Sequence, residues 1–151
     1  MKAYRRVLVA TDFSPASRAT IGAVQAIAGK GDLQVRVLYV VEPLNHILPE
    51  TNAYQRARRA RVCTELARFC ADLEKRVGGG VRARPHVATG SPAMAICRVA
   101  ESIRAQLVIV GSHGRTGYRR AMIGSVAERV ARLAQRPVLI VPGAGAHSRR
   151  R

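Results

Sequence analysis

The chain alternates short, wholly apolar runs with longer segments in which apolar residues recur every three or four positions. The short runs are typical of buried strands, and the longer segments are typical of helices with one apolar face. Strands separated by helices form right-handed βαβ units, which build a parallel sheet. We therefore predict an α/β domain with a parallel sheet and helices on both of its faces. The expected strands are Arg5–Thr11, Leu33–Val41, Val81–Ala88, Leu107–Val110 and Pro137–Val141.

Several residues predict where the helices begin and end. Ser14 is a typical N-cap and Pro15 a typical first helical residue, so we expect one continuous helix from there through Ile27. The longest helix is expected at 53–77, where three glycines end it. Two further helices are expected, from Pro92 to Arg104 and from Ser125 to Ala134.

The strand patterns also indicate positions within the sheet. Pro85 lacks the N–H that a ladder requires, so the third strand is expected at an edge. The first and fourth strands are apolar on both faces, as in central strands. If these two strands are neighbours, the chain order reverses between them, and ligands bind outside the carboxyl ends of strands at such a switch point. Asp12 and Gly111 follow these two strands, so we expect them to line one crevice.

Charge is the unusual feature of the composition. The 26 Lys and Arg residues against 9 acidic residues give a formal net charge of +17. Such a surface attracts polyanions without a dedicated site. Only 4% of the residues are aromatic and no DNA-reading motif is present, so non-specific rather than specific nucleic-acid binding is expected.

The length of 151 residues suits a single domain, which we expect at 1–143, followed by a flexible basic tail at 144–151. No apolar run is long enough for a membrane helix and none resembles a signal peptide, so a cytoplasmic location is expected. Cys63 and Cys70 are seven residues apart in the longest helix and are expected to share a buried face. With Cys97 they show no C-x-x-C spacing, which gives no indication of a disulfide set or a metal site.

The segment Gly111–Ser125, GSHGRTGYRRAMIGS, has the composition of a phosphate-binding loop. Glycines let backbone N–H groups turn towards an anion, and the start of the following helix supplies further donors. The P-loop pattern G-x-x-x-x-G-K-[ST] is absent, and the loop follows the fourth strand rather than the first, unlike the dinucleotide fingerprint. An ordinary glycine-rich surface loop remains the alternative from the residues alone.

The spacing Gly111-x2-Gly114-x9-Gly124-Ser125 resembles the ATP-binding signature of the universal stress protein family, G-x2-G-x9-G-[ST]. Four other segments are similar to the family's strands and helix starts, so the resemblance spans about residues 5–142. These segments are VLVATDFSPAS, VLYVVEP, GSPAMAI and RPVLIVP.

This resemblance implies an open five-stranded sheet of order 3-2-1-4-5, a Rossmann-like fold of the adenine nucleotide alpha hydrolase type. It implies ATP as the ligand, with Mg²⁺ or Mn²⁺ held by Asp12 through water. Val40 would recognise adenine through its backbone, and Ser125 would donate its hydroxyl to the phosphates. The full set of expected nucleotide-binding residues is Ala10, Thr11, Asp12, Val40, Val110, Gly111, Gly114, Arg115, Gly124, Ser125 and Val126.

Binding ATP differs from hydrolysing it, and the sequence leaves three functions open. The resemblance implies a nucleotide-dependent stress-response or signalling module. A slow metal-dependent ATPase or phosphoryl-transfer enzyme using Asp12 is the second, and a basic scaffold that associates with nucleic acid is the third. His113 is interpreted as a residue that shapes the loop rather than as a catalytic group. A homodimer is expected through the terminal strand, at Val138, Leu139, Ile140 and Val141, because an apolar edge strand favours pairing.

Overall fold

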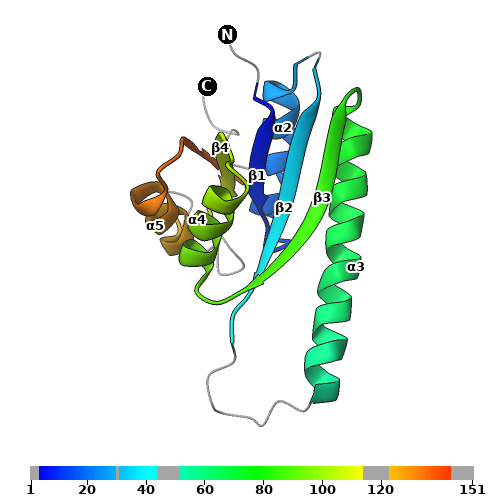
Figure 1. Cartoon of the computed structure of the whole chain (residues 1–151), viewed down its shortest axis with the longest axis vertical. Helices are drawn as coiled ribbons and strands as arrows, with labels where there is room; N and C mark the ends of the chain where they lie inside the picture. Colours follow the sequence, from blue (N-terminus) through cyan, green and yellow to red (C-terminus); the bar gives the residue numbers. More distant parts are fainter. Residues whose placement is uncertain (1–3, 30, 44–51, 114–122, 144–151) are drawn as a thin grey trace, which may run out of the picture.

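The computed structural model describes residues 4–29, 31–43, 52–113 and 123–143. They form one five-stranded sheet, parallel throughout, of order β3-β2-β1-β4-β5 (Figure 1). The predicted fold class and strand order are therefore confirmed, including the edge position of the strand that contains Pro85. The strands are β1 Arg6–Ala10, β2 Leu33–Val41, β3 Val81–Thr89, β4 Leu107–Gly111 and β5 Val138–Val141.

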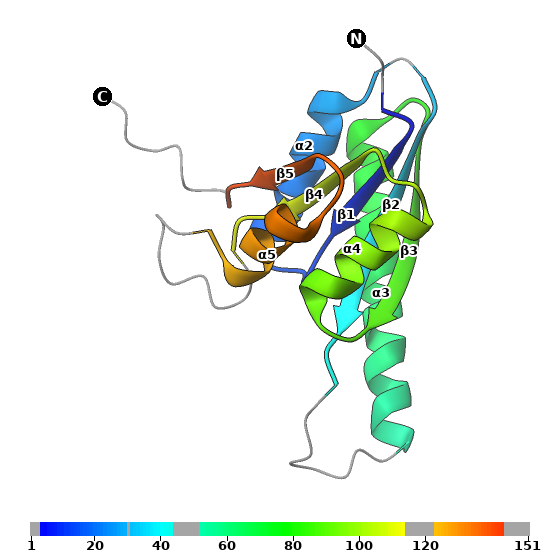
Figure 2. The ribbon, with the colours of Figure 1, turned by 60° about the vertical axis from the view of Figure 1, so that its left-hand side comes forward.

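The helices form a layer on each face of the sheet (Figures 1 and 2). The longest helix, α3, packs with α2 on one face, and α4 and α5 cover part of the other. In the part of the chain that the structure describes, no helix is long and apolar enough to cross a membrane. The helices are α1 Pro15–Arg18, α2 Thr20–Ile27, α3 Asn52–Val77, α4 Pro92–Ser102 and α5 Ser125–Leu133.

The two-residue period of the strands divides the core between the two faces. Val7 and Val9 of β1 join the cluster under α2 and α3, which also contains Leu66. Leu8, between them, joins the cluster under α4 and α5 together with Ile96. All three β1 side chains are fully buried, as predicted for a central strand.

The first helix differs from the prediction of one continuous segment. Ser14 caps it as expected, accepting a hydrogen bond from the Ser17 N–H at 3.2 Å. However, the helix breaks at Ala19 into α1 and α2. The Thr20 hydroxyl donates to the Ser17 carbonyl, and the Gly22 N–H donates to the Ala19 carbonyl at 3.1 Å, three residues back. Hydroxyl side chains compete in this way with the regular helical ladder.

The fourth helix ends earlier than its predicted limit at Arg104. Arg104 adopts a left-handed conformation with φ of 52°. Its N–H donates to the Glu101 carbonyl at 2.9 Å, and the Ala105 N–H donates to the Ala100 carbonyl at 2.8 Å. This pair of bonds is a Schellman motif, in which glycine is the usual residue at the left-handed position. The boundary was missed because arginine gives no such signal.

The expectation that Cys63 and Cys70 share a buried face is wrong for Cys63. Cys70 is buried beside Leu66 and Phe69, but Cys63 is exposed. A separation of seven residues leaves about 20° of rotation between two positions of a helix. Cys70 already lies at the margin of the buried stripe, and this rotation places Cys63 outside it.

The central pair, β1 and β4, is held by a side chain at the start of β4. The Gln106 Oε1 accepts hydrogen bonds from the backbone N–H groups of Arg5 at 2.7 Å and of Arg6 at 3.1 Å. These contacts join residues 101 and 100 positions apart in the sequence. The neighbouring β1 and β4 confirm the predicted reversal of strand order.

Candidate functional site: a cleft at the carboxyl ends of the strands

The carboxyl ends of β1, β2 and β4 meet the N-termini of α4 and α5 around a cleft of about 320 Å³, here called the carboxyl-end cleft. This volume lies at the lower end of the range found for small-molecule sites. Its lining residues are Ala10, Thr11, Asp12, Ser17, Leu38, Tyr39, Val40, Glu42, Pro92, Ile96, Val110, Gly111, Ser112, His113, Gly124, Ser125, Val126 and Ala127.

A network of hydroxyl groups fixes the corner between β1 and α1. The Thr11 Oγ1 accepts a hydrogen bond from the Phe13 N–H at 3.0 Å and lies 3.0 Å from the Ser17 Oγ. The Ser17 Oγ donates to the Ser14 carbonyl at 2.9 Å. The Asp12 Oδ1 accepts from the Ser14 N–H at 2.9 Å. The carboxylate of Asp12 is therefore held at the cleft by its own turn.

Phe13 adds backbone strain to this corner. Its φ of 64° lies in the left-handed region, which is uncommon for an aromatic residue. The ring stacks on Tyr39 of β2, with centroids 4.9 Å apart and planes inclined by 16°. Strained backbone of this kind persists where surrounding contacts fix it, and it is concentrated at functional sites.

Two glycines of the cleft are required by close backbone packing. A Cβ on Gly111 would lie 2.9 Å from the Ala16 carbonyl carbon and 3.0 Å from the Ser17 nitrogen. A Cβ on Gly124 would lie 3.0 Å from the Ser112 carbonyl oxygen, to which the Gly124 N–H already donates at 2.6 Å. These positions hold α1 and the start of α5 close to the end of β4.

The N-terminus of α5 presents backbone donors to the cleft. Gly124 is its N-cap and has no side chain to bond the first N–H groups. Ser125, Val126 and Ala127, which open the helix, all line the cleft. The N-terminus of α4 also lines it through Pro92, and its N-cap Ser91 forms no side-chain capping bond. Uncapped N–H groups and the positive ends of two helix dipoles favour an anion.

His113 presents a buried nitrogen that lacks a partner. Its Nδ1 lies 2.9 Å from the Ser112 Oγ, which orients the ring. Its Nε2 is buried and has no hydrogen-bond partner among the residues that the structure describes. A buried polar group without a partner costs free energy, so among the described residues this nitrogen is available to a polar ligand atom.

The structure brings together nine of the eleven residues predicted to bind a nucleotide, all in the lining of this one cleft. The other two, Gly114 and Arg115, lie outside the described residues. The residues predicted for a dimer interface form β5 at the sheet edge, with Leu139 the most exposed of them. The tail expected at 144–151 also lies outside the described residues.

Sequence reasoning missed several lining residues, of which Glu42 is the clearest. It follows the end of β2 as Asp12 follows the end of β1, so the same strand-end criterion would have found it. Tyr39 and Ser17 carry no such signal, because Tyr39 lies within β2 and Ser17 within α1 rather than directly after a strand. In the described ranges, no group of three or more His, Cys, Asp or Glu residues is placed to hold a metal ion.

A model of the universal stress protein family matches residues 3–142 of this chain. Universal stress protein MJ0531 of Methanocaldococcus jannaschii is 30% identical to it over 141 residues, covering 91% of this chain and 82% of that protein. The solved structure of MJ0577, from the same organism, has the same fold, with a TM-score of 0.76, 24% identity and coverage of 93% and 97%. A universal stress protein in complex with cAMP gives a TM-score of 0.70 at 25% identity, with coverage of 93% and 98%.

Proposed function

The chain belongs to the universal stress protein family, and from this premise we propose that its carboxyl-end cleft binds ATP. The protein then acts as a nucleotide-dependent module in stress response or signalling. The observation that carries the proposal is the uncapped N-terminus of α5, whose first three residues line the cleft. A relative of known structure holds cAMP, which is also an adenine nucleotide.

The cleft has suitable surfaces for each part of the ligand. The phosphates would lie at the N-terminus of α5, where backbone N–H groups and the Ser125 hydroxyl can donate to them. The buried Nε2 of His113 would gain a ligand partner. The apolar wall of Leu38 and Val40 on β2 suits the adenine ring, with the Val40 backbone available for hydrogen bonds. Gly114 and Arg115 are proposed to complete the phosphate site.

A divalent metal fits this site only when phosphate oxygens supply part of its coordination. Asp12 and Glu42 are the carboxylates in the cleft lining, and Asp12 is occupied in part by its bond to the Ser14 N–H. Mg²⁺ typically binds through one or two carboxylates, substrate phosphates and several waters. Asp12 is therefore proposed to hold Mg²⁺ or Mn²⁺ through water, where the metal would neutralise phosphate charge.

Replacing Ser125 with glutamate should weaken ATP binding by about tenfold or more, equivalent to about 1.4 kcal/mol. The added carboxylate lies at the start of α5, where it suits the helix dipole but repels the phosphates. Calorimetric titration with ATP measures the affinity. Gln135→Glu, exposed beyond the end of the same helix, is the matched control and should bind as the parent protein does. Equal affinity in Ser125→Glu would contradict phosphate binding at this helix.

The alternative of a slow ATPase is tested separately from binding. Mass spectrometry of the purified protein identifies any nucleotide that it retains. Single-turnover assays with Mg²⁺ or Mn²⁺ then measure phosphate release. Release that depends on Asp12 favours the ATPase, because hydrolysis requires charge stabilisation on the transferred phosphoryl group. Retained ATP without release over hours favours the regulatory module.

We also propose that the protein forms a homodimer through β5. This strand is at the sheet edge, and Leu139 is 36% exposed there. Ile140 and Val138 instead pack against the core under α4 and α5, so changing them would also perturb the fold. Leu139→Lys should therefore convert the dimer to a monomer with little loss of stability. Light scattering gives the mass, and a dimeric Leu139→Lys protein would exclude this interface.

A further inference from the structure

Part of one sheet face is left uncovered beside α4. Along β2, the side chains of Leu33, Val35 and Val37 enter the core under α3. The alternation of a strand therefore turns Gln34 and Arg36 to the opposite face, which α4 covers only further along, at Leu38. On β3, the alternation turns Arg82 and Arg84 to the same face.

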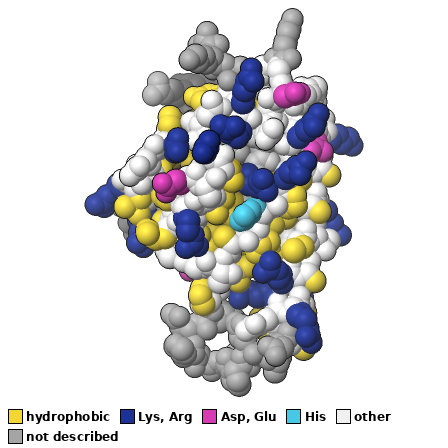
Figure 3. Space-filling view, viewed as in Figure 1, with side chains coloured by type: hydrophobic (Ala, Val, Ile, Leu, Met, Phe, Trp, Pro, Cys, Tyr) yellow, Lys and Arg dark blue, Asp and Glu magenta, His cyan; other side chains and the backbone are white. Residues whose placement is uncertain are grey.

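These residues line a second cleft, of about 350 Å³, here called the arginine cleft. It lies towards the amino ends of the strands, whereas the carboxyl-end cleft lies at their other ends. Ile103, at the end of α4, forms one wall. Figure 3 shows this side of the molecule, where Lys and Arg side chains gather around the exposed part of the sheet. The lining residues are Arg6, Val7, Gln34, Val35, Arg36, Arg82, Arg84 and Ile103.

The strand register places like charges side by side. Arg36 of β2 pairs directly with Arg84 of β3, and Gln34 lies between Arg6 of β1 and Arg82 of β3. Neighbouring strands are about 4.8 Å apart, and alternate residues of one strand are about 7 Å apart. The side chains of four arginines are therefore attached to the sheet within a small area. Like charges directly opposite each other on a sheet are destabilising, so the cluster does not contribute to the stability of the fold.

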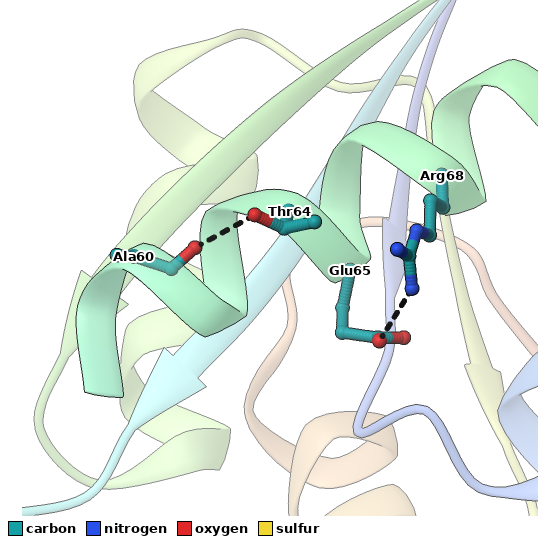
Figure 4. Close-up of polar contacts among 4 residues, drawn as sticks. All are labelled: Ala60, Thr64, Glu65 and Arg68. Atoms are coloured by element: carbon teal, nitrogen blue, oxygen red, sulfur yellow. Dashed lines mark hydrogen bonds and ion pairs between the residues drawn. The ribbon is translucent and has the colours of Figure 1, made fainter. Parts of the chain in front are cut away.

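No ion pair neutralises the cluster within the residues that the structure describes. The sequence has only 9 acidic residues, and the ion pairs among the described residues lie within α3 and α5. On α3, Arg68 pairs with Glu65 at 3.4 Å (Figure 4), and Arg76 pairs with Asp72 at 3.0 Å. The Glu74 carboxylate accepts a hydrogen bond from the Ala83 N–H of β3 at 2.7 Å.

The polar groups beside the arginine cleft do not neutralise its positive charge. Arg6 donates through its Nε to the Arg104 carbonyl at 3.3 Å, which ties its side chain to the end of α4. His86 lies on the same face of β3, two residues beyond Arg84. Burial and the charge of Arg36 lower the pKa of His86 below its usual value. Arg36 is therefore close enough to His86 to disfavour a second positive charge there.

We propose that the arginine cleft binds a compact polyphosphate anion, at a site separate from the carboxyl-end cleft. Planar guanidinium groups bind phosphate oxygens in a bidentate manner, and several converging on one hollow suit an anion with more than one phosphate group. The compact form is favoured over a nucleic-acid strand, which requires an extended basic track. The arginine-rich α3 packs on the opposite face of the sheet, so it does not continue this cluster (Figure 1).

The test uses inorganic tripolyphosphate, titrated by calorimetry at physiological ionic strength. The double variant Arg36→Gln, Arg84→Gln should bind the probe about tenfold or more weakly than the parent protein. The matched control is Arg56→Gln, Arg59→Gln, which removes the same charge from exposed positions on α3 and should change the affinity by less than about twofold. Without the probe, the first double variant should unfold at the same or a higher temperature, because like-charge repulsion is removed.

Two further measurements distinguish binding at the arginine cleft from binding elsewhere on the protein. The phosphate end of the carboxyl-end cleft can also accept tripolyphosphate, so the double variant Arg36→Gln, Arg84→Gln is compared with its parent in the Ser125→Glu background as well. The roughly tenfold loss should persist there, so failure of the proposed ATP site would not affect the result. In the parent protein, saturating tripolyphosphate should raise the pKa of His86, followed by NMR of its ring, because an anion at the cluster opposes the charge of Arg36.

The proposal is overturned by any of four results with tripolyphosphate and by one with an oligonucleotide. The four are no saturable binding, equal weakening in both double variants, loss of all binding in Ser125→Glu, or an unchanged His86 pKa at saturation. A single-stranded oligonucleotide is the competing ligand. If it displaces tripolyphosphate and its binding depends on Arg36 and Arg84 as much as on Arg56 and Arg59, the basic surface serves nucleic acid and the compact site is excluded.

Discussion

Gly111→Ala should lower the free energy of unfolding by about 1–3 kcal/mol, the usual cost of adding a methyl group to a closely packed site. The new Cβ would lie 2.9 Å from the Ala16 carbonyl carbon and 3.1 Å from its oxygen. Both are backbone atoms, so relief requires α1 to move away from β4. Urea unfolding measures the loss. ATP affinity should fall as well, because α1 and the end of β4 form adjacent walls of the cleft.

Gly22→Ala is the matched control for this substitution. Gly22 is an exposed position of α2, and a Cβ there would meet nothing within 4 Å. Alanine is favoured over glycine in a helix by up to about 1 kcal/mol, so this variant should be more stable than the parent. If Gly111→Ala also proved as stable as the parent, Gly111 would be needed for ligand approach alone and the packing argument would be wrong.

The three cysteines should react with a thiol reagent at widely different rates near pH 8. Burial, together with the charge of Glu74, raises the pKa of Cys70 to about 11, so only about one thiol in a thousand is ionised at that pH. Cys97 is half-buried, which raises its pKa too, whereas Cys63 is exposed. We expect the order Cys63, Cys97, Cys70, with Cys70 at least about a hundredfold slower than Cys63.

Single-cysteine variants and a chromogenic disulfide reagent measure these rates. In denaturant all three thiols should react at similar rates, which serves as the control for intrinsic reactivity. Rapid modification of Cys70 in the folded protein would show that α3 separates readily from the sheet. Rapid modification of Cys63 together with slow modification of Cys70 would support the stripe of Leu66, Phe69 and Leu73 as the buried face of α3.

The same thiol makes stability depend on alkaline pH. The pKa of Cys70 is higher in the folded protein than the value of 9.0 expected when unfolded. The folded state therefore holds this proton more tightly, and its contribution is complete below pH 9 and declines as pH rises towards 11. The urea midpoint of the parent protein should fall over this range more steeply than that of Cys70→Ala. Parallel pH profiles would mean that the thiol is not buried as described.

Much of the fold follows from patterns that single residues make visible. Fully apolar runs identified β1 and β4 as central strands, and Pro85 identified an edge. Asp12 and Gly111 were predicted to meet because the carboxyl ends of adjacent parallel strands share one edge of the sheet. These features depend on strand period and backbone chemistry, which a sequence expresses directly.

Other features depend on register or on local competition, which a sequence does not express. Arg36 and Arg84 are 48 positions apart in the chain, and only the pairing of β2 with β3 makes them neighbours. The break at Ala19 depends on a hydroxyl that bonds one carbonyl in preference to the helical ladder. The sequence also does not distinguish the two possible roles of Gly111. A glycine required for close backbone packing looks the same as one required for the approach of a phosphate.

The bonds from Gln106 to Arg5 and Arg6 have a consequence for how the protein folds. They join the two strands at the centre of the sheet across about one hundred residues, so the chain must close a long loop before β4 can enter beside β1. Contacts of such high sequence separation slow folding. The carboxyl-end cleft needs both strands, so no partly folded state without β4 can form the proposed ATP site. ATP should then slow unfolding while leaving the early steps of folding unchanged.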